Sequence, residues 1–392
     1  MKKLFTGIGL LCCFIPGMAR QRPPAAKPVI VITDLYYPYQ DPGDNLDLIQ
    51  GFASKEVNLL GVILDITDAF RKDTADHPVL WKDPRGPREA GIIPVEQMNY
   101  IFNRAVPYAA GPMQLMKSET DRMTDRPGFE QQGVLLLLRL LREAKEPVEV
   151  LSFGSARVLA VAFNRDSALL MRKIKTIHLS AGTASDHYAL GSDAGANAIP
   201  GGEWNVALDV CAFTRLLRSP LPIALYPCAG KDGGFSKDVN DTFYYLEDLS
   251  FFREMDPRLQ CYIDYAFDKK PPYDFLRAMD APAPYAAGKK IQFDRFSVWE
   301  SAIWLKVTGR EIIKTGPGQY VLKPATAVTS SDHVIENALR PCRFTEIRDD
   351  GRFQFAYTRQ PTHVRIYYRP DVEENEKAMN AVVPQLYRSY HP

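Results

Sequence analysis

Three stretches near the N-terminus decide the fold: VIVITD (29–34), DPGDNLDLIQGFAS (41–54) and VNLLGVIL (57–64). Residues 28–33 form a short, continuous apolar run, which is typical of a parallel strand covered on both faces. Residues 44–54 are predicted to form a helix, and residues 57–64 a second buried strand. The three stretches together predict two parallel strands joined by a helix.

The alternation continues along the chain. Further strands are predicted at 148–153, 174–179 and 221–226, and further helices at 95–105, 134–144 and from 158. This pattern predicts an α/β fold with a mostly parallel sheet and helices on both faces. Ligands of such sheets bind beyond the carboxyl ends of the strands, so we expect the polar residues that follow the strands to line one crevice.

Composition excludes several classes of protein. The chain has 392 residues, of which 46% are hydrophobic and 24% charged, so it is too apolar to be disordered. Its 48 Lys and Arg against 47 Asp and Glu give a net charge of +1. So small a net charge does not indicate binding to nucleic acid or to an anionic membrane surface.

The N-terminus has the pattern of a secretory signal at residues 1–19. Lys2 and Lys3 precede an apolar stretch that is too short to span a bilayer, and small residues follow at 17–19. A buried N-terminal helix is the alternative, whereas a lipoprotein site at Cys12 or Cys13 lacks the small residues it needs. We therefore expect an exported bacterial protein, periplasmic or secreted, with a tether at 20–27 and one domain at 28–392.

Later cysteines and apolar runs predict neither a zinc knuckle nor a membrane span. No CxxC pair occurs, and the sequence leaves open whether disulfides form. The longest later apolar run, 135–141, is interrupted by Arg139, so we expect no stable membrane span. The cysteines that follow the predicted signal are Cys211, Cys228, Cys261 and Cys342.

Carboxylates are concentrated after the first strand. Asp34, Asp41, Asp44 and Asp47 follow one another closely, and Pro42-Gly43 makes a turn before the helix. Carboxylate oxygens are ligands for hard cations such as calcium. Helix capping is the alternative, in which Asp41 caps the helix, Asp44 completes a capping box and Asp47 is solvated. The spacing alone leaves both interpretations open.

The sequence resembles the nucleoside hydrolases, the superfamily of the inosine-uridine preferring enzymes. The resemblance begins with VIVITD, DPGDNLDLIQGFAS and KEVNLLGVIL and reaches the C-terminus. It includes LSFGSARVLAVAF (151–163), GGEWNVALDVCAF (201–213), VWESAIWL (298–305) and THVRIYYRPDVEENEKAMNAVV (362–383). It implies a calcium-dependent hydrolase of N-glycosidic bonds. The expected partner is a small-molecule nucleoside or riboside, and the protein could form a homo-oligomer.

The resemblance also implies a metal site. Asp34 matches the strand-end Asp that binds the ion and takes the proton of the attacking water. Asp44 matches the helix-start ligand and Glu300 the last carboxylate ligand. The carbonyl of Arg157 would complete the shell, with its side chain incidental. Asp41 joins the set because a divergent bacterial branch carries an Asp-Pro-x-Asp element after the strand-end Thr-Asp.

Other positions match the family's substrate contacts. Glu203 and Asn205 match residues that hydrogen-bond the sugar, and Asp68 lies near a ribose-contacting Asn. Trp204 and Trp299 are candidates for stacking on the base or sugar, with core packing as the alternative.

The acid that protonates the leaving base is missing at its usual place, where Trp299 replaces a His. His187, in a loop, is the other candidate, against a solvated side chain, and His178 is expected in the core. The sequence therefore predicts that an activated aryl riboside is cleaved faster than inosine or uridine. The other departures from the family are Ile32 for an Asp, Glu300 for an Asp, and an insert at 35–40 that contains Tyr36, Tyr37 and Tyr39.

Rival functions remain open at this stage. One is a nucleoside- or sugar-binding protein without turnover, and another is a hydrolase of a different glycoside. A serine hydrolase is disfavoured because no GxSxG occurs. A Rossmann dehydrogenase is disfavoured because no GxGxxG follows the first strand.

Overall fold

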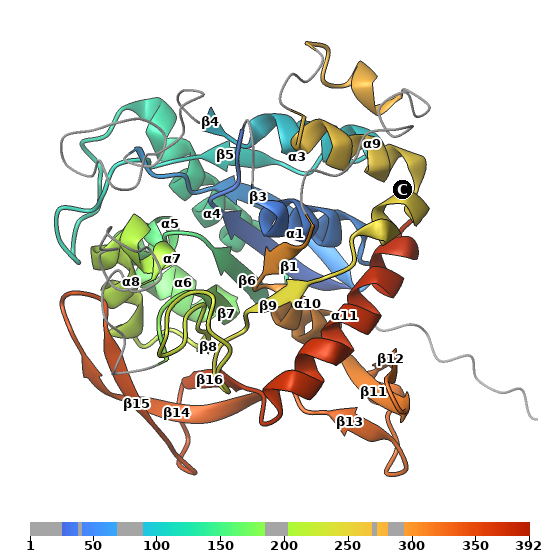
Figure 1. Cartoon of the computed structure of the whole chain (residues 1–392). Coiled ribbons are helices and arrows are strands. Elements are labelled where there is room, and N and C mark those ends of the chain that lie inside the picture. The colour runs from blue at the N-terminus through green and yellow to red at the C-terminus, as the bar shows by residue number, and fades with distance from the viewer. Residues whose placement is uncertain (1–25, 38–40, 69–88, 185–202, 269–272, 281–293) are drawn as a thin grey trace, which may run out of the picture.

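A nine-stranded sheet forms the centre of the computed structural model, which describes residues 26–392 apart from 38–40, 69–88, 185–202, 269–272 and 281–293. The strand order is β15-β14-β16-β8-β7-β6-β1-β3-β5, and Figure 1 shows it running from β5 in the upper part of the view to β14 and β15 at the bottom. Every pair from β16 to β5 is parallel, whereas β14 is antiparallel to both of its neighbours. The predicted α/β class with a mostly parallel sheet is therefore confirmed.

The bounds of the elements are as follows. The strands of the large sheet are β1 (Lys27–Thr33), β3 (Val57–Leu64), β5 (Tyr108–Ala110), β6 (Val148–Phe153), β7 (Ile174–Ser180), β8 (Ile223–Tyr226), β14 (Ala338–Ile347), β15 (Phe353–Tyr357) and β16 (Val364–Tyr368). The α-helices are α1 (Pro42–Ala53), α3 (Ile92–Ile101), α4 (Gln132–Glu143), α5 (Arg157–Arg165), α6 (Ser167–Lys173), α7 (Trp204–Leu208), α8 (Val210–Leu217), α9 (Pro257–Ala266), α10 (Ser301–Thr308) and α11 (Val372–Arg388). Short 3₁₀ helices are η1 (Gly128–Gln131), η3 (Ser250–Glu254), η4 (Arg277–Met279) and η5 (Ala325–Ala327).

The smaller sheets lie outside this nine-stranded one. They consist of β2 (Tyr36–Tyr37) with β4 (Glu89–Ala90), β9 (Tyr244–Leu246) with β10 (Phe296–Val298), and β12 (Gln319–Pro324), β11 (Arg310–Gly316) and β13 (His333–Ile335) in that order.

The apolar run of β1 is continuous because helices cover both faces of the sheet. Val29 and Val31 belong to one core cluster, which includes residues of α1, α3, α9, α10 and α11. Ile30 and Ile32 point to the other cluster, with residues of α4, α5, α6 and α8. Ile32 is thus a fully buried core residue.

The strands and helices predicted from periodicity are confirmed, with shifts of a few residues at their ends. The tether predicted at 20–27 overlaps the sheet, because β1 already begins at Lys27. The predicted signal at 1–19 lies outside the described residues. No described helix is long and apolar enough to cross a membrane. Within the described residues, Cys211, Cys228, Cys261 and Cys342 are not joined in disulfides.

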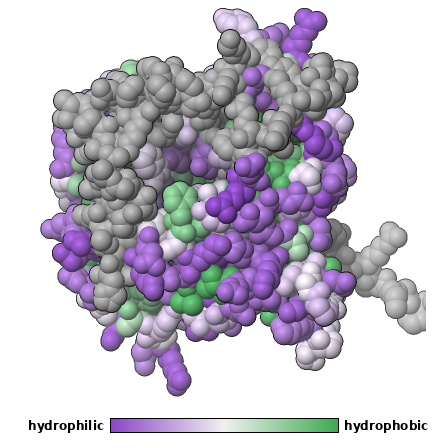
Figure 2. Space-filling model, viewed as in Figure 1, coloured by the Kyte–Doolittle hydropathy of each residue, from purple (hydrophilic) through white to green (hydrophobic). Residues whose placement is uncertain are grey.

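The antiparallel edge of the sheet and the β11–β13 sheet were not predicted. β14 carries charged side chains and Pro341, and most of its residues are exposed or half-buried. Such a strand lacks the apolar run that reveals a buried parallel strand. The face seen in Figure 2 is mostly hydrophilic, and its apolar residues lie in small separate groups.

Candidate active site at the carboxyl ends of the strands

Asp34 follows β1 directly and is buried between neighbouring strand ends. A Cβ added at Gly154, which follows β6, would lie 3.0 Å from the Asp34 nitrogen and 3.1 Å from its Cβ, so a larger residue there would push against Asp34. Burial raises the pKa of Asp34 well above its ordinary value, and the charges of Asp41, Asp65 and Glu300 raise it further. The carboxyl group of Asp34 is therefore desolvated and faces other acids.

The start of α1 brings two more carboxylates to the same place. Asp41 is the N-cap of the helix and accepts a 2.7 Å hydrogen bond from the Gly43 nitrogen, so the capping interpretation is confirmed for this residue. Asp44 accepts from the hydroxyl of Thr33 at 3.4 Å. Burial and the charges of Asp34, Asp41 and Glu300 raise the pKa of Asp44 well above its ordinary value.

Glu300, from a distant part of the sequence, is the next carboxylate of this group. It precedes α10, and the hydroxyl of Ser180 donates a 2.9 Å hydrogen bond to its Oε1. A Cβ added at Gly43 would lie 3.0 Å from Asp41 Oδ1 and 3.7 Å from Glu300 Oε2, so these two carboxylates flank the same small space. Burial raises the pKa of Glu300 to about 7, although the Ser180 hydrogen bond lowers it.

Asp47 belongs to this group, and it is not solvated as the capping alternative would have it. It is buried, and its Oδ1 accepts a 2.7 Å hydrogen bond from the indole nitrogen of Trp304. Its buried Oδ2 has no hydrogen-bond partner among the described residues. Burial raises the pKa of Asp47, and the charge of Glu300 raises it further. The helix turn after Asp44 therefore points into the protein.

We call Asp34, Asp41, Asp44, Asp47 and Glu300 the acidic cluster. Within the described part of the chain, no Lys, Arg or His forms an ion pair with Asp34, Asp44, Asp47 or Glu300. Buried carboxylates without a basic partner repel one another, and a divalent cation bound by their oxygens would relieve this repulsion.

The donor set fits a hard cation such as calcium in its chemistry. The acidic cluster supplies only oxygen atoms, the Oδ2 atom of Asp47 is buried without a partner, and the space beside Gly43 lies between two carboxylates. As the side chains stand, no group of three or more His, Cys, Asp or Glu among the described residues is arranged to hold a metal ion.

The side chain of Arg157 is not incidental, which corrects the sequence-based interpretation. It is fully buried at the start of α5 and forms ion pairs with Asp65 at 3.2 Å and Asp209 at 3.5 Å. It also donates to the hydroxyl of Thr67 at 2.7 Å and to the carbonyl of Pro112 at 3.1 Å. One guanidinium thus ties together the segments that follow β3, β5 and β6 and the N-terminus of α8.

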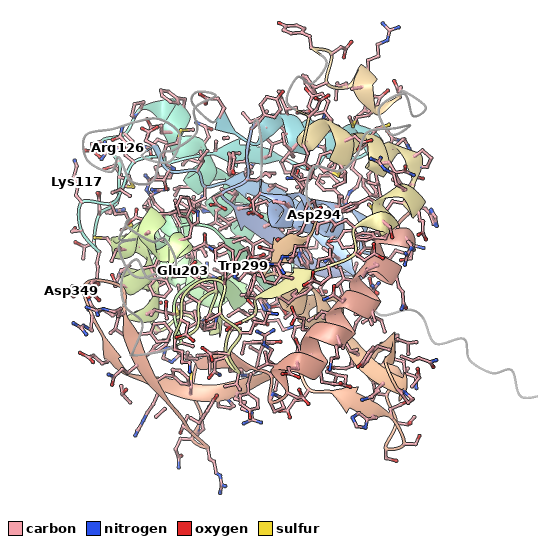
Figure 3. The ribbon with its side chains drawn as sticks, viewed as in Figure 1. Lys117, Arg126, Glu203, Asp294, Trp299 and Asp349 are labelled. Atoms are coloured by element: carbon pink, nitrogen blue, oxygen red, sulfur yellow. The ribbon has the colours of Figure 1, made fainter. Side chains whose placement is uncertain are left out.

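Glu203 and Asn205 lie at the start of α7 (Figure 3 labels Glu203). The carboxylate of Glu203 accepts hydrogen bonds from the backbone nitrogens of Gly182, Asn205 and Val206 at 2.8, 3.0 and 3.2 Å. Asn205 Nδ2 donates to the carbonyl of Ser180 at 2.8 Å. Since Ser180 also contacts Glu300, this helix start adjoins the acidic cluster.

The two tryptophans differ in their surroundings. Trp299 is half-buried, and its indole nitrogen donates to the carbonyl of Cys228 at 2.9 Å. Its ring packs against Phe243 and Phe235, with centroids 5.2 and 5.9 Å away, and Phe235 is 53% exposed. Trp204 is half-buried and packs against the core cluster that contains α1 and α10. Trp299 thus packs against other aromatic rings and precedes Glu300 in the sequence, whereas Trp204 packs against the hydrophobic core.

The remaining predicted residues contribute less to the described site. Asp68 follows the end of β3, is half-buried, and donates its backbone N–H to the carbonyl of Met113 at 2.7 Å. His187 lies outside the described residues. His178 is a core residue as predicted, with its ring nitrogens 3.2 Å from the Tyr226 hydroxyl and 3.3 Å from Glu149.

The aromatic insert packs against α9. Tyr37 stacks on Tyr265, with ring centroids 6.3 Å apart, and their hydroxyls are 3.2 Å apart. Tyr36 pairs with Ala90 in the β2–β4 sheet, and Tyr39 lies outside the described residues.

Sequence reasoning missed Asp65, and it placed Ser180 at a strand end facing the expected crevice without giving it a role. Asp65 comes directly after β3, and its backbone nitrogen donates to the carbonyl of Thr33 at 2.8 Å, beside Asp34. Ser180 ends β7 and is fully buried. Both are polar residues at the carboxyl end of a predicted strand, the signal that identified Asp34.

No family model matches the chain, and no curated protein matches it. Among solved structures, the inosine-uridine preferring nucleoside hydrolase of Bacillus anthracis is similar over 92% of this chain and 99% of its own, with 14% identity and a TM-score of 0.45. A plant nucleoside hydrolase is similar over 91% of this chain and 98% of its own, with 12% identity and a TM-score of 0.46. The purine-preferring ribonucleoside hydrolase of Gardnerella vaginalis covers 92% of this chain and 99% of its own, with 15% identity and a TM-score of 0.41. At such low similarity, the activity of this chain has to be judged from its own residues.

Proposed function

We propose that the protein is a calcium-dependent hydrolase of N-glycosidic bonds in ribonucleosides or related ribosides. The acidic cluster is the observation that carries this proposal. Its members Asp34, Asp47 and Glu300 are buried and form no ion pair with a basic side chain of the described residues, and the cluster lies at the carboxyl ends of a mostly parallel sheet, where the ligands of such sheets bind. The order of the sequence motifs supports the same reaction. The proposal includes export, because residues 1–19 have the pattern of a secretory signal.

The proposed metal ligands are Asp34, Asp41, Asp44, Glu300 and the carbonyl of Arg157. Binding requires that the carboxylates turn from their present positions toward a common point. A bound calcium ion would hold the sugar hydroxyls and the attacking water and supply positive charge.

Asp34 is the proposed general base. Its position is set by the end of β1 and by the close approach of Gly154, and an ionised carboxylate at this place can accept the proton of the attacking water. The neighbouring carboxylates favour the positive charge that develops on the sugar as the base departs. Asn205 would accept from a sugar hydroxyl through its amide oxygen, because Nδ2 donates to Ser180.

Trp299 bears on the choice of substrate. An indole N–H is not an acid that protonates a leaving base, and here it is committed to the Cys228 carbonyl. The ring instead offers an apolar surface beside Glu300. We therefore propose that substrates whose leaving group departs without strong protonation are preferred. A hydrolase of a different glycoside is the second candidate that this observation favours.

The test is a calcium-dependent turnover screen on an activated aryl riboside, inosine and uridine, with wild type and Asp34→Asn. We expect the aryl riboside to be cleaved fastest, and we expect Asp34→Asn to lower the rate by about 10²–10⁴-fold, as for loss of a general base. Near-normal turnover by Asp34→Asn would place the base elsewhere, at Asp41 in the first instance.

The other outcomes of this screen separate the rival functions. Equal rates on all three substrates would mean that a leaving-group acid exists. Calcium binding without cleavage of any of them would favour a binding protein or a hydrolase of another glycoside.

A further inference from the structure

Ser180 is the last residue of β7 and is fully buried. It lies at the carboxyl end of a central strand, between β6 and β8 in the sheet. The backbone therefore fixes its position from both sides, which suits a residue that orients others.

Two groups of Ser180 contact two different parts of the candidate site. The hydroxyl donates to Glu300 Oε1 at 2.9 Å, and the carbonyl accepts from Asn205 Nδ2 at 2.8 Å. Glu300 belongs to the acidic cluster, whereas Asn205 is the proposed sugar contact. Through these bonds a single buried residue joins the two.

The hydrogen bond to Glu300 is of the charge-assisted kind, which is about twice as strong as a neutral one. Without the hydroxyl, Glu300 would lose the donor that holds its Oε1 while the neighbouring carboxylates still repel it. Cys228 Sγ lies 3.2 Å from the same hydroxyl but offers no comparable donor to a carboxylate.

We infer that Ser180 is a positioning residue that orients Glu300 toward the cation and holds Asn205 at the sugar. It thereby keeps the cation site and the sugar contact in a fixed arrangement. This inference rests on the proposed function, because it assigns a role within the same site. It predicts that a residue without direct contact to the metal controls metal affinity. Hydrogen-bonded partners of metal ligands typically change metal affinity by about 10–100-fold when they are removed.

The experiment is calorimetry with calcium alone on wild type, Ser180→Ala, Ser180→Cys and Ser152→Ala. Ser152 is the matched control: it is a fully buried serine on the adjacent strand β6, and its hydroxyl has no hydrogen-bond partner among the described residues. We expect calcium affinity to fall by about 10-fold or more in Ser180→Ala, to fall less in Ser180→Cys, which keeps a weaker donor, and to stay unchanged in Ser152→Ala. Far-UV circular dichroism establishes that each variant is folded.

The possible results distinguish a failure of the role given to Ser180 from a failure of the proposed function. Folded Ser180→Ala with calcium affinity within about twofold of wild type would overturn the role of Ser180 and leave the proposed function standing. An equal loss in Ser152→Ala would show that any buried serine on these strands has the same general effect. Wild type that binds no calcium would overturn the proposed function, and the role of Ser180 with it.

Discussion

Two groups of carboxylates lie next to each other near the carboxyl ends of the central strands, and their partners differ. Asp65 and Asp209 share the guanidinium of Arg157. Asp34 and Asp44, one strand end away, face other carboxylates. Burial raises the pKa of the carboxyl groups in both places, to about 6 for Asp209. Arg157 lowers the pKa in the first group, whereas neighbouring acids raise it further in the second.

This difference separates a structural role from a functional one. A buried ion pair balances its own charges and holds together the segments that carry it, although Asp65 Oδ2 and Arg157 Nη1 have no hydrogen-bond partner among the described residues. Buried like charges destabilise the fold unless something positive joins them, so proteins keep such groups where a ligand or a reaction requires them. Arg157 with Asp65 and Asp209, the paired group, therefore stabilises the structure around the site, whereas the acidic cluster is the part that would bind a cation and react.

The largest effect is expected from Arg157→Met, which removes the guanidinium at nearly constant volume. Asp65 and Asp209 would then be left buried without a counter-charge, so we expect the free energy of unfolding to fall by about 3–5 kcal/mol in urea denaturation. The matched control is Arg142→Met, whose pair with Asp166 at 3.4 Å is half-exposed, with an expected loss below about 1 kcal/mol. Similar losses in both variants would mean that the Arg157 pairs have no special importance.

A smaller effect of opposite sign is expected from Asp47→Asn in calcium-free buffer. The amide oxygen can still accept from Trp304, and one negative charge leaves the acidic cluster. We expect a gain in unfolding free energy of about 1 kcal/mol, the equivalent of relieving less than one pKa unit. Asp65→Asn is the same substitution in the paired group and is expected to destabilise the protein. A lower free energy of unfolding in both Asp47→Asn and Asp65→Asn would contradict the distinction between the acidic cluster and the paired group.

Much of the fold was predictable, because both faces of the sheet are covered and the strands read as continuous apolar runs. Strand β1 and the helix after Asp41 were found at nearly their observed bounds. Strand β14 was not predicted, because its exposed and charged residues resemble a loop. Side-chain partners were also beyond prediction. Arg157 meets Asp209 only through the packing of α5 and α8, and neighbours in sequence give no sign of it.

The site was predictable in outline for the same reason. Asp34, Asp41 and Asp44 follow a recognisable strand, whereas Glu300 was placed by resemblance alone. The sequence left open whether Asp47 is solvated, because helical spacing does not reveal which neighbour covers a face of the helix; Trp304 covers it here. The place of Ser180 at a strand end was predictable, but its role was not, because its bond to Glu300 depends on how distant segments pack.

The most direct test of the central claim is calorimetric titration of calcium into wild type, Asp44→Asn and Asp349→Asn. Asp349 is the control, since its side chain is 94% exposed and far along the chain from the acidic cluster. We predict that wild type and Asp349→Asn bind calcium alike and that Asp44→Asn binds at least about 10-fold more weakly, because it loses a charged ligand. Equal affinity of all three proteins, or no calcium binding by wild type, would contradict the assignment of the acidic cluster as the metal site.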